Sequence, residues 1–479
     1  MKNVINFLFI LFSVSIGISY GLNKYFDQVT VIQLYHHLTL NFKTLISVDI
    51  KLTLKLLYYS LVIPLIVFFV IKFLISMKKF FFLQKFFYSK YFIILFISIS
   101  TWIFFNSINI LTSIKDYVKA NREDYSSFNS NIVAKKKQNN KNLIVIYVEA
   151  LENGYSDKKI FSKDLLKTIK NIDNLTNISF ENFLSQGNEY TFLGLVSTMC
   201  GFFPGPIGLS KVNTDGRDLG LYGDMFAKAT CIGDILKKNG YHNLYIGGAD
   251  KNFTAKNSFL KSHGFHEVYG KNDFKKIYDK KFFSKWGLND DKLFEFTKKK
   301  LLDLKKEKDN FFLSILTLDT HYPDGHSNEF CKKINLVETY YDKVECSSIL
   351  IRNFIDFLYA NDFFKTTNVV ITSDQLSWGL NENKIQETKR RIFNNFLTIE
   401  NENNYIKNRD WLDKFSLYPT LLTFINFEVE NGHAGFGFSG FGKIKNENFK
   451  YIFQNNNLYN YLIRKYNRFQ FSKKYYELW

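Results

Sequence analysis

The sequence is short of acidic residues relative to basic ones. Its 479 residues include 45 acidic side chains against 63 Lys and Arg, a formal net charge of +18. The lysines are scattered among Asn, Phe and Ile and form no ordered basic stripe or known nucleic-acid-binding motif, so we expect no nucleic-acid partner. Attraction to anionic lipid head groups explains the charge better, unless a general bias toward Lys, Asn, Ile and Phe accounts for it.

No small-residue cleavage site follows Tyr20, although the chain begins with an apolar segment. We therefore interpret residues 4–20 as a retained membrane anchor rather than a signal peptide. Two further apolar segments cover residues 54–75 and 91–111, and all three are about as long as a membrane-spanning helix. The sequence predicts a transmembrane anchor region over residues 1–113.

The loop between the second and third segments contains no acidic residue. Its basic residues are Lys78, Lys79, Lys85 and Lys90. Because positively charged loops tend to stay in the cytoplasm, everything after Leu111 is predicted to lie outside.

Cysteine is scarce, with four residues in the whole chain. If they pair, they agree with an outside location, since disulfides persist in oxidising compartments. Their placement indicates two local bridges, because Cys331 and Cys346 flank a short polar segment while Cys200 and Cys231 bracket a loop rich in Gly and Pro. Four buried free thiols are the alternative.

After the anchor region, residues 114–141 read as a polar linker. From Leu143 onward strand-like runs alternate with helix-like runs, one of which covers residues 164–176. This alternation is typical of an α/β sheet with helices on both faces. We expect one domain over residues 142–445. The aromatic and basic tail, 446–479, either packs on the domain or lies at the membrane interface.

Three apolar strand-like runs end on polar residues. These residues are Glu149, Asp319, His321 and Asp374. At the carboxyl ends of parallel strands, such side chains line the crevice where ligands bind. Each acid alone could instead cap the following helix, but together they indicate a functional site.

A polar loop turns into an apolar helical pattern at Thr191. A hydroxyl at a helix start meets free backbone N–H groups and the positive end of the helix dipole, which favour an anion such as phosphate. Simple capping of the helix by Thr191 is the alternative.

Seven ordered blocks resemble a known family over about residues 143–442. They read VEALENGY, NEYTFLGLVSTMCG, CIGDILKKNGY, FLKSHGF, WGLNDD, TLDTHYPDG and VVITSDQ. The chain resembles the phosphoglycerol transferases of the alkaline phosphatase and sulfatase superfamily, especially the enzymes that decorate osmoregulated periplasmic glucans, and more distantly lipoteichoic acid synthases.

The resemblance implies an alkaline phosphatase/sulfatase-like α/β/α sandwich with a mostly parallel central sheet. It also implies a multi-pass protein of the bacterial cytoplasmic (inner) membrane with its catalytic domain in the periplasm. The cysteines fall where the glucan-modifying relatives have theirs, which implies the pairs Cys200–Cys231 and Cys331–Cys346.

The family pattern makes Glu149 and Asp374 metal ligands and Thr191 both nucleophile and ligand. His321 matches a histidine near the substrate phosphate. The implied reaction moves glycerol phosphate from phosphatidylglycerol, a phospholipid donor, to a cell-envelope glycan through a phospho-threonine. A divalent cation serves this chemistry because it lowers the pKa of a bound hydroxyl and neutralises phosphoryl oxygens.

Three further residues belong to the expected site. His263 and Trp286 are candidates for substrate binding, with purely structural roles as the alternative, and Asp319 is expected to orient His321. His326 and His433 are left without a role.

Gln375 departs from the family pattern, which has His after Ser-Asp. An amide oxygen is a harder ligand than imidazole, so an all-oxygen site favours Mn²⁺ or Mg²⁺ over Zn²⁺. If Gln375 does not bind metal, the metal affinity could be too low for turnover, and a non-catalytic glycan-binding scaffold is the alternative. A phosphoethanolamine transferase or a phosphoester hydrolase could use the same site residues.

Overall fold

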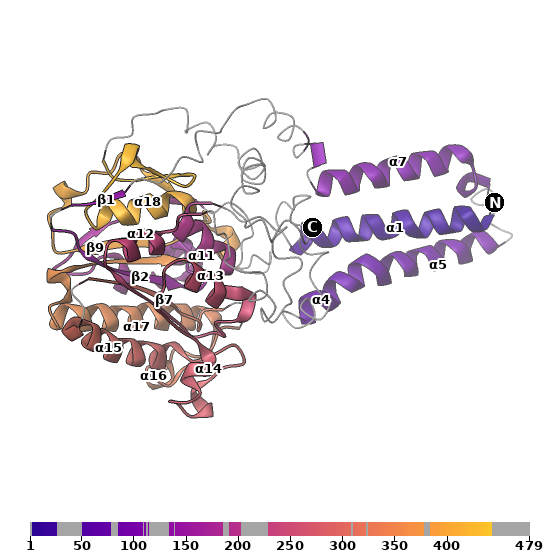
Figure 1. The fold of residues 1–479 in the computed structure, drawn as a ribbon. Helices are drawn as coiled ribbons and strands as arrows, with labels where there is room; N and C mark the ends of the chain where they lie inside the picture. Colours follow the sequence, from indigo (N-terminus) through magenta and orange to yellow (C-terminus); the bar gives the residue numbers. More distant parts are fainter. Residues whose placement is uncertain are drawn as a thin grey trace. The chain divides into compact units, whose positions relative to one another are not determined.

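The computed structural model of the chain describes most of residues 2–442. The described ranges are 2–25, 50–77, 85–108, 110–111, 114, 134–137, 139–184, 191–202, 229–307, 310–321, 324–377 and 384–442. The tail, 446–479, and most of the expected linker, 114–141, lie outside them. The described residues fall into two compact units, the N-terminal helices and the domain that begins at Ala134 (Figure 1).

The N-terminal unit contains three apolar helical stretches, as the sequence predicts. Its elements are α1 (Lys2–Tyr25), α4 (Ile50–Leu57), a π-helical turn (Tyr58–Val62), α5 (Ile63–Ser76) and α7 (Lys90–Ser107). The stretches long and apolar enough to cross a membrane are Val4–Lys24, Leu54–Leu74 and Lys90–Ser107.

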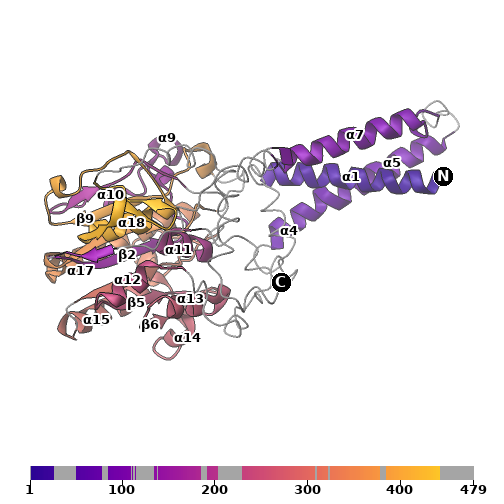
Figure 2. The same cartoon turned by 45° about the horizontal axis from the view of Figure 1, so that its top comes forward.

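Helix α1 packs against both α5 and α7 and lies between them in the view of Figure 1, whereas α5 crosses α1 in the turned view of Figure 2. A small residue of α1 permits a close approach to the stretch Leu54–Leu74. A Cβ atom on Gly17 would lie 2.4 Å from the Tyr59 carbonyl oxygen, and small residues allow such close helix contacts in a bilayer.

The domain is built on a seven-stranded sheet. In spatial order its strands are β3 (Thr176–Ile178), β9 (Asn394–Thr398), β8 (Thr367–Ser373), β2 (Asn142–Val148), β7 (Phe311–Leu316), β5 (His242–Gly247) and β6 (Glu267–Tyr269). The five strands from β8 to β6 are parallel, whereas β9 runs antiparallel to both β8 and β3. Parallel strands covered on both faces require continuous apolar runs, and β2 and β8 are buried throughout.

Helices cover both faces of the sheet (Figure 1). One face carries α15 (Asp290–Glu307) and α17 (Tyr340–Ala360), and the other carries α11 (Thr191–Cys200), α12 (Ile232–Lys238) and α18 (Lys414–Phe424). Ile144 and Ile146 of β2 share a buried core with Phe354 of α17, while the Tyr147 hydroxyl is hydrogen-bonded to Thr198 of α11 at 3.1 Å. This is the α/β/α sandwich that the sequence predicts.

Shorter elements complete the domain. The helices are α9 (Lys158–Phe161), α10 (Lys167–Lys170), α13 (Lys256–Ser262), α14 (Lys271–Phe274) and α16 (Glu329–Lys333). The strands are β1 (Ala134–Lys136), β4 (Asn182–Leu184), β10 (Trp411–Asp413), β11 (Phe427–Val429), β12 (His433–Ala434) and β13 (Gly437–Phe438). Strand β1 pairs antiparallel with β11, so this part of the expected linker is structured and belongs to the domain.

Both disulfides implied by the family resemblance are present. Cys200 at the end of α11 is bonded to Cys231, the residue before α12, and Cys331 of α16 is bonded to Cys346 of α17. The first bridge fixes the end of α11 to the next helix on the same face of the sheet.

Candidate active site

Glu149 and Asp374 follow two neighbouring parallel strands, β2 and β8. Val148 and Ser373 are partners in the strand register, so the next residue of each strand delivers a carboxylate to the same edge of the sheet. The two loops are joined directly, because the backbone N–H of Ala150 donates to Oδ1 of Asp374 at 3.2 Å. Ala150 has a φ of 55°, an uncommon value for a residue with a side chain.

Thr191 and Gln375 converge on the carboxylate of Glu149. The Thr191 hydroxyl donates to Oε2 of Glu149 at 3.3 Å, and Nε2 of Gln375 donates to Oε1 at 2.8 Å. Nε2 of Gln375 also lies 3.5 Å from the Thr191 hydroxyl oxygen. The structure therefore brings together Glu149, Thr191, Asp374 and Gln375, the four residues expected to form the metal site.

Burial governs the charge state of the two carboxylates. Glu149 is 3 % exposed and Asp374 is fully buried. Burial raises the pKa of Glu149, while hydrogen bonds from Gln375 and Thr191 lower it in part. Burial and the neighbouring charge of Glu149 raise the pKa of Asp374 to about 8, against the attraction of Lys414. Two adjacent buried carboxyl groups that resist ionisation gain from a bound cation.

The donor atoms fit a hard divalent cation. Oδ2 of Asp374 and Oε1 of Gln375 are buried and accept no hydrogen bond within the described part of the chain. Buried polar atoms are normally satisfied, so these two oxygens are available as ligands. With Glu149 and the Thr191 hydroxyl they form an all-oxygen set that could hold a divalent cation.

Lys256 adds a buried positive charge to this site. The residue is 2 % exposed, and burial lowers its pKa to about 8 against the attraction of Asp250, Glu149 and Asp374. Thr254 and Ala255, which precede it, have φ values of 54° and 59°. Strained residues of this kind are found where a structure must hold a side chain in a particular place. Lys256 is a site residue that the sequence motifs did not reveal.

His321 and Trp286 form a stacked pair. Their ring centroids are 4.8 Å apart, and Trp286 also contacts Phe253, whose carbonyl oxygen accepts from Nζ of Lys256 at 2.9 Å. The residue before His321, Thr320, donates its hydroxyl to the Glu149 carbonyl oxygen at 2.5 Å. The pair is thus connected to the carboxylate site on two sides.

His263 and Asp319 have other hydrogen-bond partners. Nδ1 of His263 lies 2.7 Å from Oδ2 of Asp234, and its ring packs on Phe259. Cys231 is close to both His263 and Asp234, but its sulfur is engaged in a disulfide. Oδ2 of Asp319 accepts from the backbone of Asp290 and from Asn328. Its expected role of orienting His321 stays a prediction.

Helix α11 approaches the Asp374 turn very closely. A Cβ atom on Gly194 would lie 1.9 Å from the Asp374 carbonyl oxygen, so only glycine permits this packing. Because Gly194 lies on the same helix as Thr191, the contact fixes the distance between the hydroxyl and the acidic turn.

An ion pair supports the far end of this turn. Glu152, fully buried, pairs with Arg390 through both oxygens, at 2.5 and 2.6 Å. The same two residues bind the backbone of Ser377, whose N–H donates to Glu152 and whose carbonyl oxygen accepts from Arg390. The segment from Asp374 to Ser377 is thereby held where it ends.

Lysine is so common in this sequence that Lys256 has no signal of its own. Glu152 could have been noticed as a second acid three residues after Glu149, within the block VEALENGY. Its role depends on Arg390, which lies far away in the sequence.

Comparison with known proteins identifies the family. The family model described as "Sulfatase" matches residues 141–427. Phosphoglycerol transferase I of Xanthomonas campestris pv. campestris is 34 % identical over 255 residues, which cover 50 % of this chain and 34 % of the relative. Phosphoglycerol transferase I of Escherichia coli is 34 % identical over 246 residues, which cover 49 % of this chain and 31 % of the relative. The chain spans about a third of the length of these relatives.

The solved structures similar to this chain include a lipoteichoic acid synthase from Listeria monocytogenes. It is 16 % identical, with a TM-score of 0.48, and the match covers 68 % of this chain and 80 % of that one.

Proposed function

Because this chain belongs to the sulfatase family, we propose that it is a membrane-anchored, metal-dependent phosphotransferase. It moves glycerol phosphate from phosphatidylglycerol to a cell-envelope glycan. Its anchor lies in the bacterial cytoplasmic membrane and its catalytic domain in the periplasm. The names of the curated relatives support the transferred group, and the apolar N-terminal helices support the membrane location.

The observation that carries the proposal is the hydrogen bond from the Thr191 hydroxyl to Glu149, beside the free ligand oxygens of Asp374 and Gln375. A nucleophile needs a neighbour that draws off its proton. A divalent cation held by Glu149, Thr191, Asp374 and Gln375 would lower the pKa of the hydroxyl and neutralise phosphoryl charge.

The reaction proceeds by two displacements at phosphorus. The Thr191 hydroxyl gives its proton to Glu149 as its oxygen attacks the phosphorus of the lipid. The bond to the diacylglycerol oxygen breaks, and diacylglycerol leaves with a proton from His321 or water. A glycan hydroxyl then attacks the phosphothreonine and gives its proton to the group that protonated diacylglycerol, while the bond to the Thr191 oxygen breaks and Thr191 takes its proton back from Glu149. Lys256 and His321 offer positive charge and hydrogen bonds to the phosphoryl oxygens, and Trp286 holds the ring of His321 in place.

The test is a transfer assay with the full chain in membranes and phosphatidylglycerol labelled in the head group. We expect diacylglycerol and labelled glycan with Mn²⁺ or Mg²⁺, and a glycerol phosphate adduct on Thr191 when the acceptor is left out. Thr191→Ala should abolish both products. Ser197→Ala is the matched control, because this hydroxyl of the same helix is buried and has no hydrogen-bond partner within the described residues.

Two outcomes would contradict the proposal. Turnover of phosphatidylethanolamine in place of phosphatidylglycerol would mean a phosphoethanolamine transferase. Binding of glycan without turnover by any metal would support a non-catalytic scaffold.

A further inference from the structure

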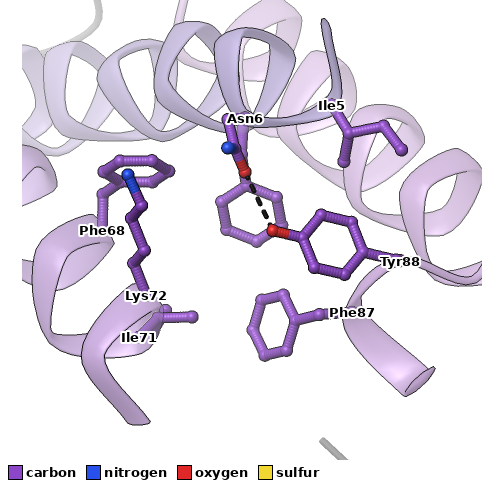
Figure 3. Close-up of a pocket in the computed structure, with 8 residues that line it drawn as sticks. Ile5, Asn6, Phe68, Ile71, Lys72, Phe87 and Tyr88 are labelled. Carbon is purple, nitrogen blue, oxygen red and sulfur yellow. Dashed lines mark hydrogen bonds between the residues drawn. The ribbon is translucent and has the colours of Figure 1, made fainter. Parts of the chain in front are cut away.

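A pocket lies at one end of the helices of the N-terminal unit (Figure 3). It is lined by Ile5, Asn6 and Phe9 of α1, by Phe68, Ile71 and Lys72 of α5, and by Phe87 and Tyr88. Asn6 and Lys72 both lie within three residues of a span end, since the spans are Val4–Lys24 and Leu54–Leu74. The pocket is therefore at the depth of lipid head groups rather than of acyl chains.

Three phenylalanine rings line the pocket, and its polar side chains, Asn6, Lys72 and Tyr88, all carry hydrogen-bond donors. The rings of Phe9 and Phe87 pack at a tilt, with centroids 5.2 Å apart. The Tyr88 hydroxyl donates to Oδ1 of Asn6 at 3.2 Å, which leaves the amide N–H groups of Asn6 without an acceptor within the described part of the chain. Figure 3 shows Lys72 extending from α5 toward α1, on the opposite side of Asn6 from Tyr88.

Lys72 has no counter-ion among the described residues of the N-terminal unit. Its ammonium group forms no ion pair with a described residue, and the sequence contains no Asp or Glu before Asp27 or between Ile50 and Ser113. A lysine beside apolar rings at a membrane boundary gains from a bound anion. The basic residues at this end of the helices also include Lys2, Lys85 and Lys90.

We propose that this pocket binds the head group of an anionic phospholipid, with Lys72 contacting the phosphate and Asn6 donating hydrogen bonds to it. Basic pockets between membrane helices hold anionic head groups in this way. The acyl chains would continue along the apolar helices. The pocket residues belong to the N-terminal unit, whereas Glu149 and Thr191 belong to the domain. The proposal does not rest on the proposed transfer reaction, and the lipid is proposed to be bound rather than consumed.

The alternative is that water, rather than a lipid head group, surrounds the ammonium group of Lys72. A lysine near the end of a span can extend its ammonium group into the aqueous phase and serve only as an anchor. In that case the charge of Lys72 would act through the general surface potential, and any lysine at this end of the helices would contribute equally.

The experiment measures lipid retention by the purified full chain with native mass spectrometry. Phosphatidylglycerol is titrated against phosphatidylcholine with the same acyl chains, in neutral detergent. We expect one tightly retained phosphatidylglycerol. Lys72→Ala should weaken it roughly fivefold, as one lost lysine–phosphate contact at a membrane surface predicts. Lys72→Arg should retain it, and excess inorganic phosphate should not displace it.

Lys90→Ala is the matched control, because Lys90 lies at the same end of the helices but does not line the pocket. It should leave retention unchanged. Equal losses in Lys72→Ala and Lys90→Ala would overturn the proposal in favour of a general surface effect, as would equal retention of phosphatidylcholine. If Lys72→Ala proves unstable, Asn6→Leu provides the second variant, and unchanged retention there would count against the site.

Discussion

At the scale of single residues, the site differs from the family pattern at Gln375. Its amide nitrogen is hydrogen-bonded to Glu149, while its oxygen has no hydrogen-bond partner among the described residues. The side chain can therefore assist Glu149 and still present an oxygen ligand. A glutamine in this position is consistent with a working site for a hard cation, although it lacks the imidazole nitrogen that zinc favours.

We predict that Gln375→His shifts the metal preference of the protein toward Zn²⁺. Imidazole is a borderline ligand that suits zinc, whereas the amide oxygen suits Mn²⁺ and Mg²⁺. Competition titrations with a metal indicator on the purified protein should show zinc affinity increased by about tenfold or more, since one ligand is exchanged for a better one. Gln375→Leu should weaken all three metals. Because zinc binds more tightly than manganese at most protein sites, the test is the ratio of the two affinities. The same ratio in Gln375→His and in the unchanged protein would refute the assignment.

At the scale of elements, the ion pair of Glu152 and Arg390 joins the loop after β2 to the chain entering β9. Its bidentate geometry and the two bonds to Ser377 make it more than a surface contact. Burial raises the pKa of Glu152, and the hydrogen bond and charge of Arg390 lower it. Removing one residue of the pair leaves the charge of the other buried without a counter-ion.

We expect Arg390→Ala to destabilise the domain by about 3 kcal/mol, the usual cost of breaking a buried pair from one side. Urea unfolding measures it. The neighbouring Arg391→Ala is the control, because the guanidinium of Arg391 bonds only to the carbonyl oxygen of Arg390 within the described residues. A double variant with Glu152→Gln should recover part of the loss. If Arg390→Ala and Arg391→Ala unfold alike, the pair contributes little.

A second link between elements predicts a pH dependence. Glu267 of β6 accepts from Tyr269, from His242 of β5 and from Lys300 of α15. Burial alone would raise its pKa, but these hydrogen bonds and the charge of Lys300 lower it to about 2. A carboxyl group with a lowered pKa in the folded state contributes stability above its unfolded pKa, near 4.5, and loses it as the pH falls toward 2.

The melting temperature of the protein should therefore fall more steeply between about pH 5 and about pH 2 than that of Glu267→Gln, because the variant lacks this titration. Glu428→Gln, at an exposed position of β11, should follow the unchanged protein. Parallel curves for the protein and Glu267→Gln would show that the network carries no net stabilisation.

Individual strands and helices of the domain show how far the sequence could predict the structure. The strands ending on Glu149 and Asp374 could be predicted because buried parallel strands are uniformly apolar. Strand β1 could not, since its sequence Ala-Lys-Lys is largely exposed and its strand conformation comes from pairing with β11. The pattern of residues 164–176 predicts one helix, but only Lys167–Lys170 is helical there. Ile169 and Ile172 supply core contacts without a long helix.

The candidate site likewise contains residues that the sequence could predict and residues that it could not. Glu149 and Asp374 could be predicted from the apolar strand pattern and the family resemblance, because the end of a parallel strand determines where the next side chain lies. Lys256, Gly194 and Arg390 act through contacts between segments that are distant in sequence, and none of them has a local signature. Gly194 matters only because the Asp374 carbonyl oxygen lies against it.

At the scale of the whole molecule, the membrane helices and the domain are separate compact units, with separate tasks under the proposed function. The domain contains the whole set of candidate ligands and its own core and disulfides. The contribution of the helices to transfer should then be to keep the domain at the surface where its lipid substrate is concentrated, which is an effect of local concentration rather than of chemistry.

We predict that the domain without residues 1–113 binds metal as the full chain does and turns over a short-chain, water-soluble phosphatidylglycerol at the same rate. With long-chain phosphatidylglycerol in vesicles, its rate should fall by about a hundredfold, in the range by which a tether raises effective concentration. Thr191→Ala in the truncated chain sets the background. An equal loss on both lipids would mean that the helices shape the site itself, and an equal rate on vesicles would mean that the domain reaches the membrane unaided.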